Sequence, residues 1–510
     1  MSNTMTKLRF KFAVRSSIMT LLLAGCMVGP KYQAPSPSAN ATAPPVAYKE
    51  SPTQFQETEG WKVAQPQDAM LHGKWWEIYG DPELNTLEDQ LNINNQNIKE
   101  FFENFMEART LIAQARSQLY PTIGTSPSYQ AARSSSNLTN APSANTGRVS
   151  SIGSLPFDVS WEPDLWGKVR NTIHEQQYNA QLSAADLENE RLTEQASLAA
   201  FFFEIRGQDA LQKILNDTVD ADQKALDLAR ARYETGVDDR ISVVEAESTL
   251  QSVQSQAINL GVARAQFEHA IAVLVGTNPS QFSIPVKPLL TNAPAVPVGM
   301  PSGLLERRPD IAGAERKMAA ANAQIGIAYA AYYPSLSLSA SYGYESSNFS
   351  HFFNLPSRFW SVGPTLSETI YDGGLRRAQV NQFITTYNAD VASYRQTVLT
   401  AFQQVEDSLS TVRILSQQII KQEQAEKSSE EALKLETARY ETGVDPYLDV
   451  VTAQTTLLNN QQTLATLHVQ EMTASVQLIE ALGGGWDRSQ LPTPAEVSKK
   501  LDKADTTIQK

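Results

Sequence analysis

Hydrophobic residues recur every seven positions through two long tracts of the chain. In the second half this stripe runs through Val398 and Val405, and in the first half through Leu198 and Ile205. A repeat near 3.5 residues predicts helices that pack along their whole length with coiled-coil geometry. A helix over residues 171–235 would be about 100 Å long at 1.5 Å per residue. Such a helix is longer than a globular domain requires, and a periplasmic coiled-coil spacer is one interpretation of it.

Four shorter segments alternate with period two. The stretch SLSLSASYGY from Ser335 places Leu and Tyr on one face and Ser or Gly on the other. Segments of about ten residues with this pattern are typical of transmembrane β-strands, although a soluble half-buried hairpin shows the same alternation. We expect the strands at residues 121–133, 149–162, 334–347 and 357–369. Aromatic residues at their ends indicate an interfacial girdle, and these are Tyr120, Tyr332, Tyr333, Phe359, Trp360 and Tyr371.

Four strands are too few to close a barrel by themselves. An open sheet edge in lipid would leave N–H and C=O groups unpaired, and known barrels begin near eight strands. If these segments cross a membrane, several chains must therefore contribute to one barrel. A dimer would give eight strands and a trimer twelve.

The chain contains a tandem repeat. The heptapeptide RYETGVD occurs at Arg232–Asp238 and again at Arg439–Asp445, and the surrounding 20-residue stretches share 13 identities. The order of strand pair, glycine corner, helical tract, RYETGVD and second helical tract is the same in both halves. We therefore expect a first structural repeat at 71–280, a linker at 281–301 and a second repeat at 302–490.

Each RYETGVD copy predicts a tight turn between two helices. Gly236 and Gly443 suit the left-handed position that follows a helix end. Asp238 or Asp239 in the first copy, and Asp445 in the second, suit the N-cap of the next helix. Each arginine falls in the last helical turn, where a cation favours the helix dipole and the free carbonyl groups. The turn residues of interest are Arg232, Tyr233, Gly236, Val237, Asp238, Arg439, Tyr440, Gly443 and Val444.

The N-terminus resembles a bacterial lipoprotein signal. Residues 1–25 combine a basic start with the short apolar run IMTLLLAG, and Cys26, the only cysteine, follows directly. We expect the Cys26 thiol to receive the lipid, although an ordinary signal peptide would look similar. Residues 26–70, rich in Pro, Ala and Ser, predict an extended tether, and residues 491–510 predict a polar tail.

Charge and composition exclude several functions. Residues 1–25 carry four basic residues and no acidic ones, leaving 38 basic against 55 acidic residues. Such an acidic chain disfavours nucleic acid as a partner. Its five histidines have no metal-ligand spacing, and no nucleotide-binding or hydrolase motif occurs. We expect no enzymatic activity, no cofactor and no bound metal.

The chain resembles the TolC-like outer-membrane factors, in the NodT-type lipoprotein branch that serves RND efflux pumps. The resemblance covers nearly all of the sequence after the signal. It rests on GCMVGPKYQAP at Gly25, WWEIYGDPELNTL at Trp75, LLERRPDIAGAE at Leu304, the second RYETGVD and ALGGGW at Ala481. The block around RRPDIAGAE is the most specific of these.

This resemblance implies a mixed α/β membrane channel. Three chains with four strands each would form a 12-stranded β-barrel in the outer membrane, continued by a long α-helical barrel across the periplasm. The helix tips would dock a periplasmic adaptor that bridges to an inner-membrane RND transporter, and the duct would export drugs or other small toxic compounds. The duct of a type I protein-secretion system is the nearest alternative within the channel class, and a non-pore periplasmic scaffold is the alternative outside it.

The resemblance also implies that the second-repeat tip forms a constriction. Asp449 lies four residues after Asp445 on one helical face, so a trimer would bring three Asp449 carboxylates together. Arg240 is a candidate partner for Asp445 or Asp449. Thr452 stands where relatives often carry another aspartate. Tyr447 completes the predicted gate residues.

Overall fold

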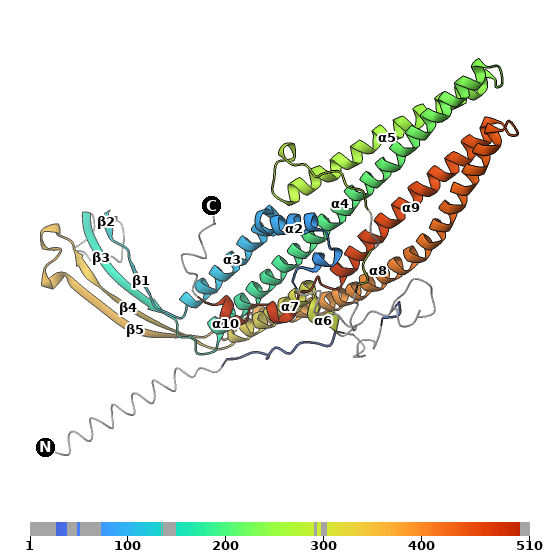
Figure 1. Cartoon of the computed structure of the whole chain (residues 1–510). Helices are drawn as coiled ribbons and strands as arrows, with labels where there is room; N and C mark the ends of the chain where they lie inside the picture. The colour runs from blue at the N-terminus through green and yellow to red at the C-terminus, as the bar shows by residue number, and fades with distance from the viewer. Residues whose placement is uncertain are drawn as a thin grey trace.

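A computed structural model describes residues 27–37, 48–50, 73–133, 135, 149–289, 293–296 and 303–499. The predicted signal sequence, Cys26, most of the tether and the end of the tail lie outside the described residues. The rest forms a slender molecule with a curved sheet at one end and two helical hairpins at the other (Figure 1).

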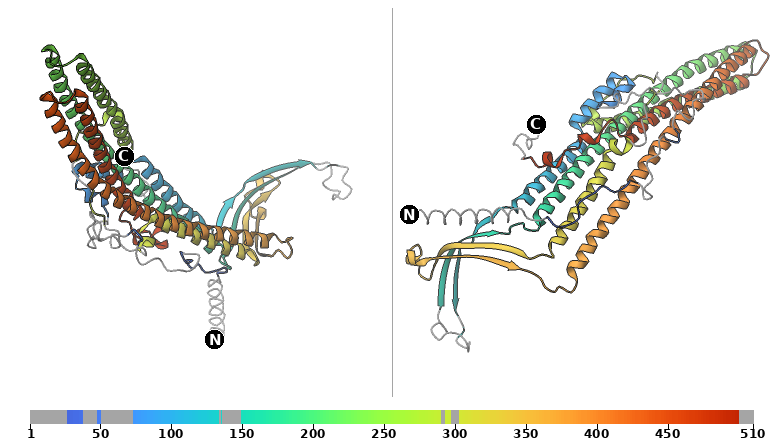
Figure 2. Two further views of the ribbon diagram at one scale, coloured as in Figure 1. Left: turned by 90° about the vertical axis from the view of Figure 1, so that its right-hand side faces the viewer. Right: turned by 90° about the horizontal axis from the view of Figure 1, so that it is seen from below.

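The two hairpins are equal in length. In the first, α4 (Lys168–Glu234) is followed by α5 (Arg240–Leu274), and in the second α8 (Leu375–Glu441) is followed by α9 (Tyr447–Ala481). Both long helices have 67 residues and both return helices have 35. At 1.5 Å per residue the long helices extend about 100 Å. Both tips lie at the same end of the molecule (Figures 1 and 2).

A glycine corner and an aspartate begin each long helix. Gly167 precedes α4 and Gly374 precedes α8, both with positive φ. The Asp164 carboxylate accepts hydrogen bonds from the backbone N–H groups of Val169 and Arg170, at 3.2 and 3.0 Å. Asp372 accepts from Gly374 at 2.9 Å and from Arg376 at 3.2 Å. These carboxylates satisfy N–H groups that have no partner within the helix.

The strands form one antiparallel sheet. Its order is β1 (Thr122–Thr125), β3 (Val149–Trp161), β4 (Ser335–Ser346) and β5 (Arg358–Ser367), and β2 (Ser128–Arg133) also pairs with β3. β1 and β2 are therefore two parts of one strand position, and the sheet has four positions. The sequence predicted an unbroken strand at 121–133. The break falls at Ser126 and Pro127, since proline has no N–H to donate to the ladder.

The register gives the sheet one apolar face and one polar face. Ile123 pairs with Val159, Val159 with Ala340, and Ala340 with Val362. The adjacent row joins Gly124, Asp158, Ser341 and Ser361 on the other face. Apolar side chains on the first face are open in a single chain, and Ile123 is 75 % exposed and Val362 73 % exposed.

Shorter helices pack against the hairpins in the half of the molecule nearer the sheet, away from the tips (Figure 1). η3 (Trp75–Tyr79), α2 (Pro82–Asn94) and α3 (Gln96–Ser117) lie against α4. In the second repeat, α6 (Leu304–Arg307) leads into α7 (Pro309–Ala330), which lies between α4 and α8. The short α10 (Pro494–Val497) contacts α4. Within the described residues, no helix is both long enough and apolar enough to cross a membrane.

The largest core cluster joins the first repeat to α9. Trp75 is fully buried there with Phe202 and Ile205 of α4, Ile271 of α5 and Ile479 of α9. A second cluster holds α7, α8 and α9 together. The middle of the molecule is therefore a packed belt from which the sheet and the hairpins project.

Candidate functional site

The two RYETGVD turns have the same backbone. Gly236 and Gly443 follow the helix ends with φ of 72° and 76°, as the sequence predicted. The Val237 N–H donates to the Arg232 carbonyl at 2.9 Å, and the equivalent bond from Val444 to Arg439 is also 2.9 Å. These bonds satisfy carbonyl groups at the helix C-terminus. The shared heptapeptide therefore builds the bend itself.

The aspartates at the ends of the two turns have different partners. Asp239 is the N-cap of α5, because its Oδ1 accepts from the N–H groups of Ile241 and Ser242 at 2.9 and 3.2 Å. In the second copy Pro446 occupies the N-cap position and no side chain caps α9. Our expectation that Asp445 is an N-cap was therefore wrong. Its carboxylate instead pairs with the Arg439 guanidinium.

Because Asp239 provides the cap, Asp238 is available to contact the other hairpin. The Tyr440 hydroxyl of α8 donates to Asp238 Oδ2 at 2.7 Å. Arg232 of α4 lies 4.7 Å over the Tyr440 ring, and its Nη1 donates to the Glu441 carbonyl at 3.2 Å. Three contacts therefore join the two tips: a hydrogen bond to a carboxylate, a cation–π contact and a hydrogen bond to the backbone.

At neutral pH the Asp238 carboxylate of this contact is ionised and the Tyr440 hydroxyl is protonated. Burial opposes ionisation of Asp238, but hydrogen bonds from Tyr440 and Ser242 outweigh it and the pKa of Asp238 is lowered. Burial and then the Asp238 hydrogen bond raise the pKa of Tyr440, so its hydroxyl remains a donor. In the other turn, the hydrogen bond from Arg439 lowers the pKa of Asp445.

Acidic groups gather at the second tip. Carboxylate oxygens of Glu436, Asp445 and Asp449 all lie within 4.8 Å of one another. Asp449 is exposed in the first turn of α9, as predicted. Arg240 is exposed and makes no ion pair within the described part of a single chain, so its pairing with Asp445 or Asp449 stays a prediction about neighbouring chains.

The remaining predicted gate residues are divided between core and surface. Tyr447 is 3 % exposed, and its ring centroid lies 5.3 Å from that of Tyr440. It therefore packs in the core beneath the tip. Thr452 is exposed and returns its hydroxyl to the Leu448 carbonyl at 2.9 Å. The large hydrophobic turn residues at the surface are Tyr233, Val237 and Val444, which are 46 %, 66 % and 66 % exposed.

The RRPD block lies far from the tips and braces the belt. Arg308 precedes α7, where its Nη1 donates to Gln404 of α8 at 2.8 Å and to the Ala481 carbonyl of α9 at 2.9 Å. Its Nη2 donates to Asp310 at 2.7 Å. The sequence identified this block as specific but gave it no role, because its partners are distant in the chain.

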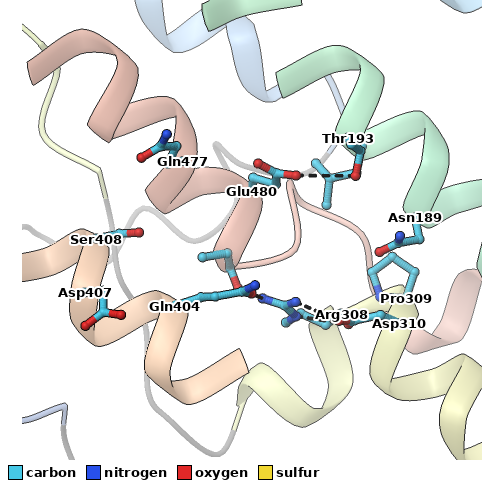
Figure 3. A pocket seen from close by; sticks show the side chains of 12 residues that line it. Asn189, Thr193, Arg308, Pro309, Asp310, Gln404, Asp407, Ser408, Gln477 and Glu480 are labelled. Carbon is cyan, nitrogen blue, oxygen red and sulfur yellow. Dashed lines mark hydrogen bonds and ion pairs between the residues drawn. The ribbon is translucent and has the colours of Figure 1, made fainter. Parts of the chain in front are cut away.

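A polar cavity of about 520 Å³ opens beside this brace, between α4, α7, α8 and α9 (Figure 3). Thr193 donates to Glu480 across it at 3.3 Å, and burial raises the pKa of that carboxyl group. The cavity is lined by Asn189, Leu192, Thr193, Arg308, Pro309, Asp310, Gln404, Asp407, Ser408, Gln477, Glu480 and Ala481.

The first described residues after Cys26 are held between the sheet and the helices. The Val28 N–H donates to the Trp166 carbonyl at 3.1 Å, and the Val28 carbonyl accepts from Asn171 at 3.1 Å. A Cβ built on Gly29 would lie 2.6 Å from the Gly326 Cα, so the two backbones approach as only glycines allow. Val28 and Gly29 therefore lie at the junction of the sheet and the helical part.

The sequence matches the family described as "Outer membrane efflux protein" over residues 87–277 and 300–484. It is 30 % identical over 491 residues to the solvent efflux pump outer membrane protein SrpC of Pseudomonas putida, covering 94 % of this chain and 100 % of SrpC. It is also 30 % identical over 492 residues to outer membrane protein OprJ of Pseudomonas aeruginosa, covering 94 % and 97 % of the two chains. The structure of the outer-membrane channel OprN matches with a TM-score of 0.80 at 25 % identity, covering 90 % of this chain and 100 % of that one.

Proposed function

The chain belongs to the outer membrane efflux protein family, and from this premise we propose that three copies form the exit duct of a tripartite pump. The predicted family and the predicted fold class, with long helices and four strand positions per chain, are confirmed. The chain is the outer-membrane component of an RND-type efflux pump, a non-enzymatic class. Neither the type I secretion duct nor the periplasmic scaffold gains support from these relatives.

The sheet is the observation that carries the proposed assembly. Its apolar face has the composition of a lipid-facing surface, and its Ser- and Gly-rich face suits a water-filled interior. Within the described residues, β5 is unpaired along one edge and β1 along the other. Such edges require partners in lipid. Joining β5 of one chain to β1 and β2 of the next closes twelve strands around a threefold axis.

The hairpins then continue the barrel into the periplasm. In this assembly six tips, two per chain, surround the entrance, and the Tyr440–Asp238 contact fastens the two tips of each chain. The adaptor contacts the exposed side chains of Tyr233, Val237 and Val444 through apolar interactions. Asp449 contributes to an acidic constriction whose Arg240 partners come from neighbouring chains.

Lipid attachment at Cys26 fits the position of the segment that follows it. Met27 contacts Gly167 at the corner that begins α4, next to Trp166 and Tyr333, whose rings stack 4.8 Å apart. Aromatic pairs of this kind concentrate at membrane interfaces. An acyl chain on Cys26 would therefore enter the periplasmic leaflet of the outer membrane beside the barrel.

The proposed cargo is small toxic compounds, because the relatives are named for efflux of antibiotics, solvents and toluene. The test is drug and dye accumulation in the native host after deletion of the gene, with complementation by the full chain. We expect deletion to raise accumulation and the chain to restore efflux. A Cys26→Ser chain, carried on an ordinary signal peptide, separates the anchor from the duct.

Two outcomes would overturn the proposal. Accumulation that is unchanged by deletion, in a host with no second channel of this family, would remove the efflux function. Secretion of a protein that stops on deletion, with drug accumulation unchanged, would favour the type I duct.

A further inference from the structure

One buried carboxyl group lies between the two hairpins, below the tips. Asp222 of α4 is 2 % exposed, and its Oδ1 accepts a hydrogen bond from Gln454 Nε2 of α9. Its second oxygen, Oδ2, is buried with no hydrogen-bond donor. Burying a carboxylate with one unsatisfied oxygen in an apolar contact costs considerable free energy. Burying a neutral carboxylic acid there costs much less.

The position belongs to the stripe that joins the hairpins. Asp222 lies seven residues after Leu215 and four before Leu226, both of which are buried. On the facing helix, Gln454 lies between the buried residues Val450 and Leu458. These neighbours form apolar clusters from both hairpins. The pair is therefore one polar layer within an apolar contact.

The equivalent position in the second repeat carries no acid. The position equivalent to Asp222, 207 residues later, is Ser429. Ser429 is 7 % exposed and accepts a hydrogen bond from Asn460 at 3.1 Å. This position therefore holds a neutral hydroxyl group whose partner lies in its own hairpin, whereas Asp222 contacts the other hairpin. What Asp222 adds is a group that can change charge.

We propose that Asp222 is a proton-operated latch between the hairpins: its neutral form holds α4 against α9, and its ionisation favours their separation. The consequence for opening of the tips rests on the proposed function. The dependence of hairpin separation on protons does not.

The electrostatics of the surroundings support this role. Burial raises the pKa of Asp222 to about 6, and the hydrogen bond from Gln454 only partly opposes it. Among the neighbouring titratable groups, Tyr447 of α9 interacts with Asp222, Glu245 of α5 interacts with Tyr447, and Tyr440 of α8 packs in the same cluster as Tyr447. Burial, with the charges of Asp222 and Glu245, raises the pKa of Tyr447 to about 12, so it stays neutral. No cation among the described residues contributes to stabilising the Asp222 carboxylate.

The direction of the pH effect follows from the raised pKa. In the separated state water reaches Asp222, and its pKa returns toward 3.8. The packed state is therefore favoured most at low pH, and it loses this advantage as the pH rises toward 6. The ratio of packed to separated hairpins should fall about tenfold between pH 5 and pH 7.5. Asp238 at the tip has a lowered pKa and stays ionised throughout this range.

Distance measurement between the tips tests the latch. Val237 and Val444 occupy equivalent, exposed positions, one on each hairpin. Both are replaced by spin-labelled cysteine in a Cys26→Ser full chain, reconstituted in lipid nanodiscs with an excess of unlabelled chain. We expect long distances to become more populated at pH 7.5 than at pH 5. Asp222→Asn and Asp222→Ser, which are neutral at all pH values, should remove the pH dependence and favour the short distances at both values, at least as strongly as the unsubstituted chain does at pH 5.

The matched control is Asp220→Asn, which removes an exposed acid from the same helix and should respond as the unsubstituted chain does. Distances that do not change with pH in the unsubstituted chain would overturn the proposal, as would a full pH response in Asp222→Asn or Asp222→Ser. A chain that shows the response yet conducts no ions in bilayers would refute the duct and leave the latch intact.

Discussion

Removing the Tyr440 hydroxyl tests whether the contact between the tips keeps them together. Tyr440→Phe deletes the 2.7 Å hydrogen bond to Asp238 and preserves the ring beneath Arg232 and beside Tyr447. Asp238 keeps its bond from the Ser242 hydroxyl at 3.1 Å. The substitution therefore removes one interaction and leaves the surrounding contacts in place.

The size of the effect follows from the kind of bond lost. Hydrogen bonds to charged groups contribute about 1.5–3 kcal/mol. The Asp238 side chain is 19 % exposed, so water partly replaces the lost donor and the lower end applies. A loss of about 1.5 kcal/mol raises the ratio of separated to joined tips roughly tenfold in each chain.

Single-channel recording of the purified assembly in planar bilayers measures this change. We expect Tyr440→Phe to show more frequent and longer high-conductance openings than the unsubstituted protein. Tyr233→Phe is the matched control, because Tyr233 is the same motif position in the first copy and its hydroxyl makes no hydrogen bond in the described structure. Equal opening in all three proteins would refute the role of this contact.

Three further predictions concern the acidic tip, the brace and the N-terminal segment. Asp449→Asn should raise single-channel conductance and lower cation selectivity, measured as a smaller reversal potential in a salt gradient, because it removes an exposed negative charge from the constriction; an unchanged reversal potential would place Asp449 outside the pore. Arg308→Leu should lower the thermal denaturation midpoint, because it leaves buried acceptors and a carboxylate without their donor, which costs about 3 kcal/mol of stability. A midpoint within error of the unsubstituted protein would contradict a stabilising role for the Arg308 contacts. Gly326→Ala should increase proteolysis of the N-terminal segment, because the new Cβ would lie 2.6 Å from Asn171. Gly261→Ala, at a helical position with open space, is its control, and equal proteolysis of the two variants would contradict the role of Gly326 in packing the N-terminal segment.

Much of the architecture could be predicted because the chain is duplicated. The repeat predicts two hairpins of equal length, and the structure gives helices of 67 and 35 residues in each. The period-two segments predict the four strand positions. The break at Pro127 was missed because the alternation of side chains continues across it, whereas the backbone pairing does not.

The contacts of the tips could be predicted only in part. RYETGVD is identical in both copies, yet Tyr440 bonds across to the other hairpin and Tyr233 does not. The local signal for this difference is the residue after the motif: Asp239 caps α5 and frees Asp238, whereas Pro446 leaves Asp445 to Arg439. Which tyrosine then meets Asp238 depends on how the hairpins lie side by side, and that is a property of the packed belt.

Electron cryomicroscopy of the full chain purified in lipid nanodiscs tests the central claim most directly. We expect a threefold assembly with twelve strands in the membrane and six hairpin tips gathered at the opposite end, enclosing one continuous duct. A twofold assembly with eight strands, or single chains whose sheets remain open, would contradict it.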